Sequence, residues 1–254
     1  MTTFSLDQHP AKPAESLAGT ATSIGLALLI ALVVKSLVFQ PFTIPSSSME
    51  PTLRTGDYLI VSKFAYGWSR FSFPFNPPLF RGRTLGAAPK RGDVIVFKLP
   101  RDHGKTDYVK RLIGLPGDRV QVLRGQVLVN GAPLPRAMGA VVDDPEMALR
   151  RVTEVAETNP EGRRYVTYAE SPDHEGETTG VYVVPTGQYF FMGDNRDNSL
   201  DSRWPGEVGV GFVPAEDLEG RVELVVASWR GASIFRPWTW VTRLDGRRLF
   251  HRVS

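Results

Sequence analysis

The hydrophobic pattern changes once along this chain, from one long apolar run to a series of short strand-like segments. The run extends from Ala18 to Phe39 and is densest over residues 24–34. At about 1.5 Å of helical rise per residue, it just covers a hydrocarbon core about 30 Å thick. Lys35 lies near the outer end, where its long stem can reach the headgroups, and Pro41 ends the helix.

Three structures compete for this run. A cleaved secretory signal is disfavoured, because the run is too long and no small-x-small site precedes a plausible mature start. A buried core helix would have to tolerate apolar residues on every face. We therefore predict a retained membrane anchor over residues 18–40, preceded by a tail over residues 1–17. The tail carries Lys12 against Asp7 and Glu15, so charge alone does not orient the anchor.

After Phe42 no second run of similar length appears, and the pattern is that of strands. The strand-like segments are rich in β-branched residues and bounded by Gly, Pro or Asp, as in residues 57–62, 93–98, 108–113, 119–123, 126–130, 187–193 and 220–228. Arg124-Gly125 and Asn130-Gly131 read as hairpin turns. The 24 glycines and 20 prolines make turns frequent. We predict a mainly β fold, with an antiparallel β-rich domain after the transmembrane helix.

The middle of the chain has a different character. Between about residues 133 and 180 acidic residues accumulate and apolar runs become sparse. We interpret residues 120–186 as a smaller β/loop subdomain inserted into a main domain made of residues 41–119 and 187–235. A long solvated loop is the alternative.

Aromatic residues concentrate in two segments, residues 64–80 and 229–240, and the second leads into an arginine-rich tail over residues 236–254. Aromatic rings and arginines suit a bilayer–water interface, which makes membrane lipid a predicted partner. Core aromatics followed by a solvated basic tail would give the same pattern.

Composition excludes several classes of function. The chain has 254 residues, 42% of them apolar or aromatic, so a sizeable core is feasible. The net charge of +3 and the absence of a basic run interleaved with aromatics argue against nucleic acid as a partner. The four histidines are scattered and there is no cysteine, so neither a zinc site nor a cysteine protease is expected.

A serine and a lysine are the candidates for chemistry. Ser48 closes a serine-rich turn just after the apolar run, and Lys110 lies in a strand among Val109, Leu112 and Ile113. A buried lysine loses its charge, and the neutral amine can take a proton from a serine hydroxyl. The alternatives are an ordinary polar linker for the serines and a lysine whose ammonium reaches solvent at a sheet edge. The Gly-x-Ser-x-Gly, Ser-x-x-Lys and His-Glu-x-x-His patterns of other hydrolases are absent.

Four segments in order resemble those of bacterial type I signal peptidases. Residues 45–53 (PSSSMEPTL) are similar to the serine box of that family, residues 90–97 to one of its strands, residues 107–118 to its lysine box and residues 193–203 to its C-terminal box. The resemblance covers most of the chain from Gln40 to Arg203, but not residues 133–180 or the N-terminal tail.

The resemblance implies roles for individual residues. Ser48 would be the nucleophile and Lys110 its base, while the Ser46 hydroxyl and the Ser48 N–H would form the oxyanion hole. Ser199 would hydrogen-bond the lysine amine and orient it, although a plain turn residue is the alternative. The remaining expected supports of the site are an ion pair between Asp201 and Arg203 and acceptance of backbone N–H bonds by Asp194.

Substrate would lie extended beside residues 42–44 and 107–109, adding a strand by backbone hydrogen bonds. The resemblance implies two shallow apolar pockets that select small residues at the first and third positions before the cut. The substrate-binding residues would be Phe42, Ile44, Pro45, Met49, Leu53, Asp107, Tyr108 and Val109. No metal or organic cofactor is needed, because the lysine supplies the base.

The expected function is that of a membrane-bound serine endopeptidase that removes signal peptides from exported preproteins. The resemblance implies a single-pass protein of the bacterial inner membrane with its catalytic domain on the periplasmic side. Two rivals remain. Autoproteolytic repressors with a similar serine–lysine fold would carry a DNA-binding domain in place of the anchor, and an inert membrane-tethered β scaffold would need neither Ser48 nor Lys110.

Overall fold

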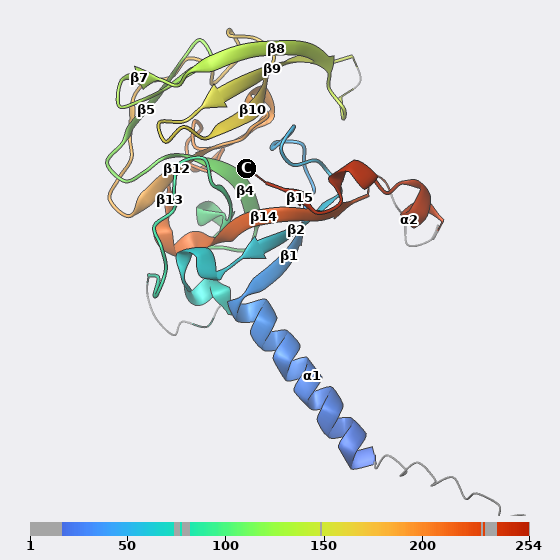
Figure 1. Cartoon of the computed structure of the whole chain (residues 1–254). Helices are drawn as coiled ribbons and strands as arrows, with labels where there is room; N and C mark the ends of the chain where they lie inside the picture. The colour runs from blue at the N-terminus through green and yellow to red at the C-terminus, as the bar shows by residue number, and fades with distance from the viewer. Residues whose placement is uncertain are drawn as a thin grey trace, which may run out of the picture.

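The computed structural model describes residues 17–73, 77, 82–147, 149–229, 231 and 238–253. One helix projects from a body made of β-sheets (Figure 1). The predicted tail over residues 1–17 lies outside the described residues except for Leu17, and so do parts of the aromatic segments 64–80 and 229–240.

Helix α1 (Leu17–Leu37) occupies most of the predicted anchor. Its apolar side chains, such as Leu28 and Ile30, are more than half exposed in the isolated chain. In the part of the chain whose side chains are described, no helix meets both the length and the apolarity that crossing a membrane requires. A helix therefore forms at the predicted place, and its passage through a membrane stays a prediction.

The largest sheet has eight strands, all paired antiparallel. Its order is β1-β2-β14-β3-β4-β12-β13, with β15 beside β14. The strands are β1 (Phe39–Thr43), β2 (Asp57–Ser62), β3 (Val94–Lys98), β4 (Asp107–Gly114), β12 (Gln188–Met192), β13 (Val213–Pro214), β14 (Leu218–Ser228) and β15 (His251–Arg252). The predicted mainly β, antiparallel fold is confirmed.

The alternating side chains of β3 supply two cores. Ile95 and Phe97 enter one apolar cluster, where the Phe97 ring stacks on Phe191 at 4.7 Å between centroids. Val94 and Val96 enter a second cluster. Phe42 of edge strand β1 and Val109 of β4 both pack against this second cluster.

The chain between β4 and β12 builds two smaller sheets, which lie above the large one in Figure 1. One is a three-stranded sheet of β8 (Arg136–Asp143), β9 (Arg151–Thr158) and β10 (Arg164–Ala169) in the order β10-β9-β8. The other, in the order β11-β5-β6-β7, is made of β5 (Arg119–Leu123), β6 (Gln126–Val129), β7 (Ala132–Pro133) and β11 (Tyr182–Val183). A long solvated loop over residues 133–180 is therefore wrong as an interpretation.

Both predicted hairpin turns are present. Arg124 and Gly125 have φ of 47° and 74°, and Asn130 and Gly131 have φ of 54° and 81°. This left-handed geometry matches the twist of the flanking strands and favours glycine at the second position.

The remaining regular structure is short. Helix α2 spans Thr239–Thr242, and 3₁₀ turns span Phe64–Tyr66, Arg70–Ser72, Pro100–Asp102, Arg196–Asn198, Ala215–Asp217 and Gly246–Arg248.

Candidate active site

Ser48 lies on the connection between β1 and β2. Residues 44–57, which include the first residue of β2, are here called the serine loop. Its two ends are joined by hydrogen bonds from the Ile44 N–H to the Asp57 carbonyl and from the Gly56 N–H to the Ile44 carbonyl, each 3.0 Å. Met49 and Leu53 are fully buried in the second core cluster and hold the loop down. The position of Ser48 is therefore fixed by the joined ends of the loop and by its two buried side chains.

Lys110 points into the protein beside this serine. Its side chain is only 3% exposed, and its Nζ donates a hydrogen bond of 2.5 Å to Ser48 Oγ. Burial lowers the pKa of Lys110 to about 8, against the opposing influence of Asp201 and Asp194. The alternative of a lysine that reaches solvent is wrong.

The two expected oxyanion donors, the Ser46 hydroxyl and the Ser48 N–H, lie close to Ser48 Oγ. Ser46 is exposed, and its Oγ lies 3.4 Å from Ser48 Oγ. Among the described residues the Ser48 N–H has no hydrogen-bond acceptor, so it is available to a ligand. Also among the described residues, no group of three or more His, Cys, Asp or Glu side chains is placed to hold a metal ion.

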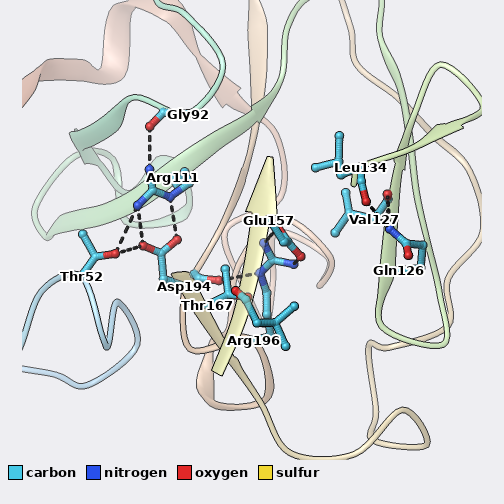
Figure 2. Close-up of polar contacts among 12 residues, drawn as sticks. Thr52, Gly92, Arg111, Gln126, Val127, Leu134, Glu157, Thr167, Asp194 and Arg196 are labelled. Atoms are coloured by element: carbon cyan, nitrogen blue, oxygen red, sulfur yellow. Dashed lines mark hydrogen bonds and ion pairs between the residues drawn. The ribbon is translucent and has the colours of Figure 1, made fainter. Parts of the chain in front are cut away.

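Asp194 is engaged differently from the expectation. Its carboxylate accepts hydrogen bonds from Arg111, Nε to Oδ1 at 2.8 Å and Nη2 to Oδ2 at 2.7 Å, and from the Thr52 hydroxyl at 2.5 Å (Figure 2). Arg111 is fully buried and also donates to the Gly92 carbonyl at 2.8 Å. Contrary to the prediction, no backbone N–H of the described residues donates to Asp194, because its carboxylate serves as the counter-charge of the buried Arg111 guanidinium on β4.

Asp201 and Arg203 form the expected ion pair, with Arg203 Nε 2.9 Å from Asp201 Oδ1. Asp201 also accepts the Gly193 N–H at 2.9 Å, and Arg203 reaches Glu177 at 2.6 Å. Burial would raise the pKa of Asp201, but the Arg203 guanidinium and these hydrogen bonds hold it below its usual value. An anion is therefore maintained near Lys110.

The hydrogen bond expected between Ser199 and Lys110 is not formed. Ser199 is buried, and the charged group that its hydroxyl interacts with is the Asp201 carboxylate, whose pKa it helps to lower. Its hydroxyl faces Gly193, where an added Cβ would lie 2.3 Å from Ser199 Oγ and 2.5 Å from the Ser48 carbonyl oxygen. Only glycine at position 193 lets the serine loop and the 193–203 segment approach this closely.

Sequence reasoning missed two asparagines that hold the serine loop. The Asn195 N–H donates to the Ser48 carbonyl at 3.1 Å, and Asn195 Nδ2 donates to the Ser47 carbonyl at 3.2 Å. Asn198 Nδ2 donates to Ser47 Oγ at 2.9 Å. The Asp/Asn-rich composition of residues 193–203 was the available signal, but it did not say what these amides would contact.

The residues expected to bind substrate divide into two groups. Those that lie in or against the second core cluster are Phe42, Ile44, Met49, Leu53 and Val109. Tyr108 packs against the first cluster, and its ring centroid lies 5.6 Å from Lys110 Nζ. Asp107 pairs with Lys98 Nζ at 2.6 Å, and Pro45 is exposed.

Two strand edges face the site. Among the described strands β1 pairs only with β2, and the β4–β12 pairing extends no further toward the start of β4 than Arg111 and Met192. The backbone of residues 107–110 is therefore unpaired on the β12 side, opposite its pairing with β3.

A family model and two sequence relatives indicate the same family. The family model described as signal peptidase, peptidase S26, matches residues 17–229. A signal peptidase I from Rickettsia typhi is 39% identical over 212 residues, covering 80% of this chain and 77% of the relative. One from Rickettsia felis is 38% identical over 253 residues, covering 91% of each. A solved signal peptidase I from Enterococcus faecalis V583 is 26% identical, covers 53% of this chain and 97% of its own, and superposes with a TM-score of 0.30.

Proposed function

Because the chain belongs to the signal peptidase family, peptidase S26, and is a hydrolase of that family, we propose that it cleaves signal peptides with Ser48 as nucleophile and Lys110 as general base. The observation that carries this proposal is the 2.5 Å hydrogen bond from the buried Lys110 Nζ to Ser48 Oγ. A lysine whose pKa is about 8 is partly neutral near neutral pH, as a general base must be.

In the first half of the reaction, Ser48 Oγ attacks the scissile carbonyl while its proton passes to the Lys110 amine. The carbonyl oxygen gains the negative charge and accepts hydrogen bonds from the Ser46 hydroxyl and the Ser48 N–H. The intermediate then breaks its C–N bond. The Lys110 ammonium returns the proton to the leaving nitrogen, which departs as the new N-terminus of the mature protein, and Ser48 is left as an ester.

In the second half, a water molecule gives its proton to the neutral Lys110 amine and attacks the ester carbonyl. The same two donors stabilise the second oxyanion. The C–O bond to Ser48 breaks, the lysine returns the proton to Ser48 Oγ, and the signal peptide leaves with a free carboxylate. The dyad is thereby restored without any cofactor in the proton balance.

The substrate is proposed to bind as a strand between the free edges of β1 and β4. Its backbone would hydrogen-bond the unpaired groups of these strands next to Ser48. Met49 and Leu53 have no exposed surface and would form the floor of the first pocket, while Phe42 and Val109 would shape the second. Because the Met49 and Leu53 side chains occupy the bottom of this pocket, it has room only for small substrate side chains such as alanine.

We also propose that α1 anchors the chain in the bacterial inner membrane, with the β body on the periplasmic side. The support is its exposed apolar surface and the connection of α1 to β1 through Val38 alone. Signal peptides of exported preproteins and membrane lipid are the proposed partners, and nucleic acid is not among them.

The decisive experiment is preprotein cleavage by purified variants. Ser48→Ala should be inactive with an unchanged melting temperature, because only a loop hydroxyl is removed. Lys110→Met should also be inactive, and Lys110→Arg nearly so, since a guanidinium does not deprotonate at working pH. Lys105→Met, which changes an exposed lysine five residues away, is the matched control and should retain wild-type turnover.

Wild-type turnover by folded Ser48→Ala would remove the serine from the mechanism. Wild-type turnover by Lys110→Met as well would mean that other residues catalyse the cleavage, whereas the inert scaffold would be indicated if the wild-type protein itself cleaved no preprotein.

A further inference from the structure

The C-terminal segment, residues 238–253, returns to the back of the serine loop. Its last strand, β15, runs along β14, with Arg252 opposite Leu224 and His251 opposite Val225 (Figure 1). The Asp245 N–H donates to the Ser228 carbonyl at 3.0 Å, and the Asp245 carboxylate caps the following 3₁₀ turn by accepting the Arg247 N–H at 3.1 Å. These contacts fix the turn that ends at Arg248.

Arg248 is buried and spans two points of the serine loop. Its Nε donates to Asp57 Oδ1 at 3.0 Å, and its Nη2 donates both to Asp57 Oδ2 and, at 2.9 Å, to the Thr52 carbonyl. Asp57 is fully buried and also accepts the Arg54 N–H at 2.8 Å. One guanidinium thus binds the loop's closing residue and a carbonyl in its interior.

Both points connect directly to the site. The Asp57 carbonyl accepts the Ile44 N–H at the base of the loop, and the Thr52 hydroxyl donates to Asp194, the partner of Arg111. Ser48 lies in the chain between Ile44 and Thr52. Because Arg248 contacts both Asp57 and Thr52, it restricts where the Ser48 hydroxyl can lie relative to Lys110.

We propose that Arg248 is a positioning residue for the nucleophile, through which the C-terminal segment fixes the serine loop from behind. This inference rests on the proposed function, because it presupposes that Ser48 attacks substrate. A displacement of about 1 Å in a reacting group can reduce rate about 100-fold, so a contact far from the substrate can govern turnover.

The test compares Arg248→Gln with Arg247→Ala in the full chain. Arg247 is the neighbouring, exposed arginine and should leave kinetics unchanged. Arg248→Gln should lower kcat about tenfold to 100-fold and should change KM less, because Phe42 on β1 and Val109 on β4 lie outside the serine loop and keep their places. Amide hydrogen exchange should accelerate at Glu50 and Leu53, whose N–H groups bond within the loop to Ser47 and Met49, but not in β3.

A second variant separates positioning from general stability. Arg248→Gln leaves the Asp57 carboxylate buried without its counter-charge, whereas the double variant Asp57→Asn/Arg248→Gln removes that charge. The double variant should recover the melting temperature yet keep the low kcat, since the Thr52 carbonyl still lacks its donor. Recovery of wild-type kcat in the double variant, or exchange that rises equally in the loop and in β3, would overturn the positioning role.

Ser48→Ala, measured in the same series, distinguishes failure of the proposed function from failure of the positioning role of Arg248. An active Ser48→Ala would refute the proposed function itself. An inactive Ser48→Ala together with a wild-type kcat in Arg248→Gln would refute the role of Arg248 alone.

Discussion

At the scale of single residues, the site depends on a lysine that the fold keeps from solvent. Charged lysine is strongly hydrated, so placing Lys110 in the protein interior disfavours its ammonium form and lowers its pKa to about 8. Asp201 and Asp194 work in the opposite direction and keep the pKa from falling further. In the proposed mechanism this balance would make Lys110 neutral often enough to act as a base and basic enough to take the serine proton.

The pH dependence of activity should report this balance. Below about pH 8 Lys110 is mostly protonated, so kcat/KM should rise about tenfold per pH unit there and level off above it. The measurement is kcat/KM on a preprotein across pH 5–10. A rising limb near 6.5, as for an ordinary histidine, would indicate another base.

The stability of the fold should depend on the same group. Lowering a lysine pKa from 10.5 to about 8 corresponds to about 3 kcal/mol against the charged form in the folded protein. Between these values the unfolded chain binds the extra proton, so stability rises with pH from about 8 to about 10.5 and is lowest below that range. Lys110→Met should therefore stabilise the protein at pH 7, and chemical denaturation should show its advantage shrinking toward pH 10.5.

Ser46 is the side chain whose removal should slow the reaction without ending it. In Ser46→Ala the Ser48 N–H survives as one oxyanion donor, so kcat should fall on the order of 10²–10³ with KM little changed. A change confined to KM would place Ser46 in substrate binding instead.

At the scale of elements, two adjacent residues of β4, Lys110 and Arg111, point to opposite faces of the large sheet. Side chains alternate along a strand, so Lys110 faces Ser48 while Arg111 faces Asp194 and stacks on Tyr165, 4.1 Å from its guanidinium carbon to the ring centroid. The second face ties the large sheet to β10. A further buried pair, Arg196 with Glu157 of β9, ties the 193–203 segment to the small sheet (Figure 2).

Breaking one of these pairs should affect both stability and the dyad. Asp194→Asn leaves the buried Arg111 charge uncompensated, which should cost about 3–5 kcal/mol in the free energy of unfolding. It also removes an anion that raises the pKa of Lys110, so the rising limb of kcat/KM should move to lower pH. Denaturant titration and pH profiles measure the two effects.

The control is Asp143→Asn, whose ion pair with Arg151 is largely exposed and should be worth less than about 0.5 kcal/mol. Equal losses of stability in both variants would show that burial of the Arg111–Asp194 pair is not what matters.

At the scale of the whole molecule, α1 should determine where the chemistry happens. Three acidic substitutions along its apolar surface, Leu26→Asp, Leu29→Asp and Val33→Asp together, should release the protein from membranes into an alkaline carbonate wash that leaves wild type bound. Each central charge costs about 2.5–3.5 kcal/mol of membrane insertion. Met138→Asp, at an exposed site on β8, should stay bound, and release of wild type itself would contradict an anchor.

Much of this molecule could be predicted from its sequence. Short segments rich in β-branched residues indicated the strands, and a continuous apolar run indicated the helix at α1. The pairs Arg124-Gly125 and Asn130-Gly131 indicated the β5–β6 and β6–β7 turns, where these residues have positive φ. The serine-rich turn and the lysine among valines and leucines made Ser48 and Lys110 candidates, and the resemblance of four segments to a known family favoured them over a polar linker and a solvent-reaching lysine. Each of these signals is local, because it depends on the properties of residues next to one another in the chain.

The tertiary structure alone decided what these residues contact. Lys110 meets Ser48 across 62 positions, Arg111 meets Asp194 across 83, and Arg248 meets Asp57 across 191. Whether a lysine is neutral, which cation Asp194 pairs with, and whether Ser199 reaches the amine all depend on how the sheet curls and which loops it brings together. Burial and counter-charge arise only when distant segments exclude water from a common space, and no local pattern specifies that space.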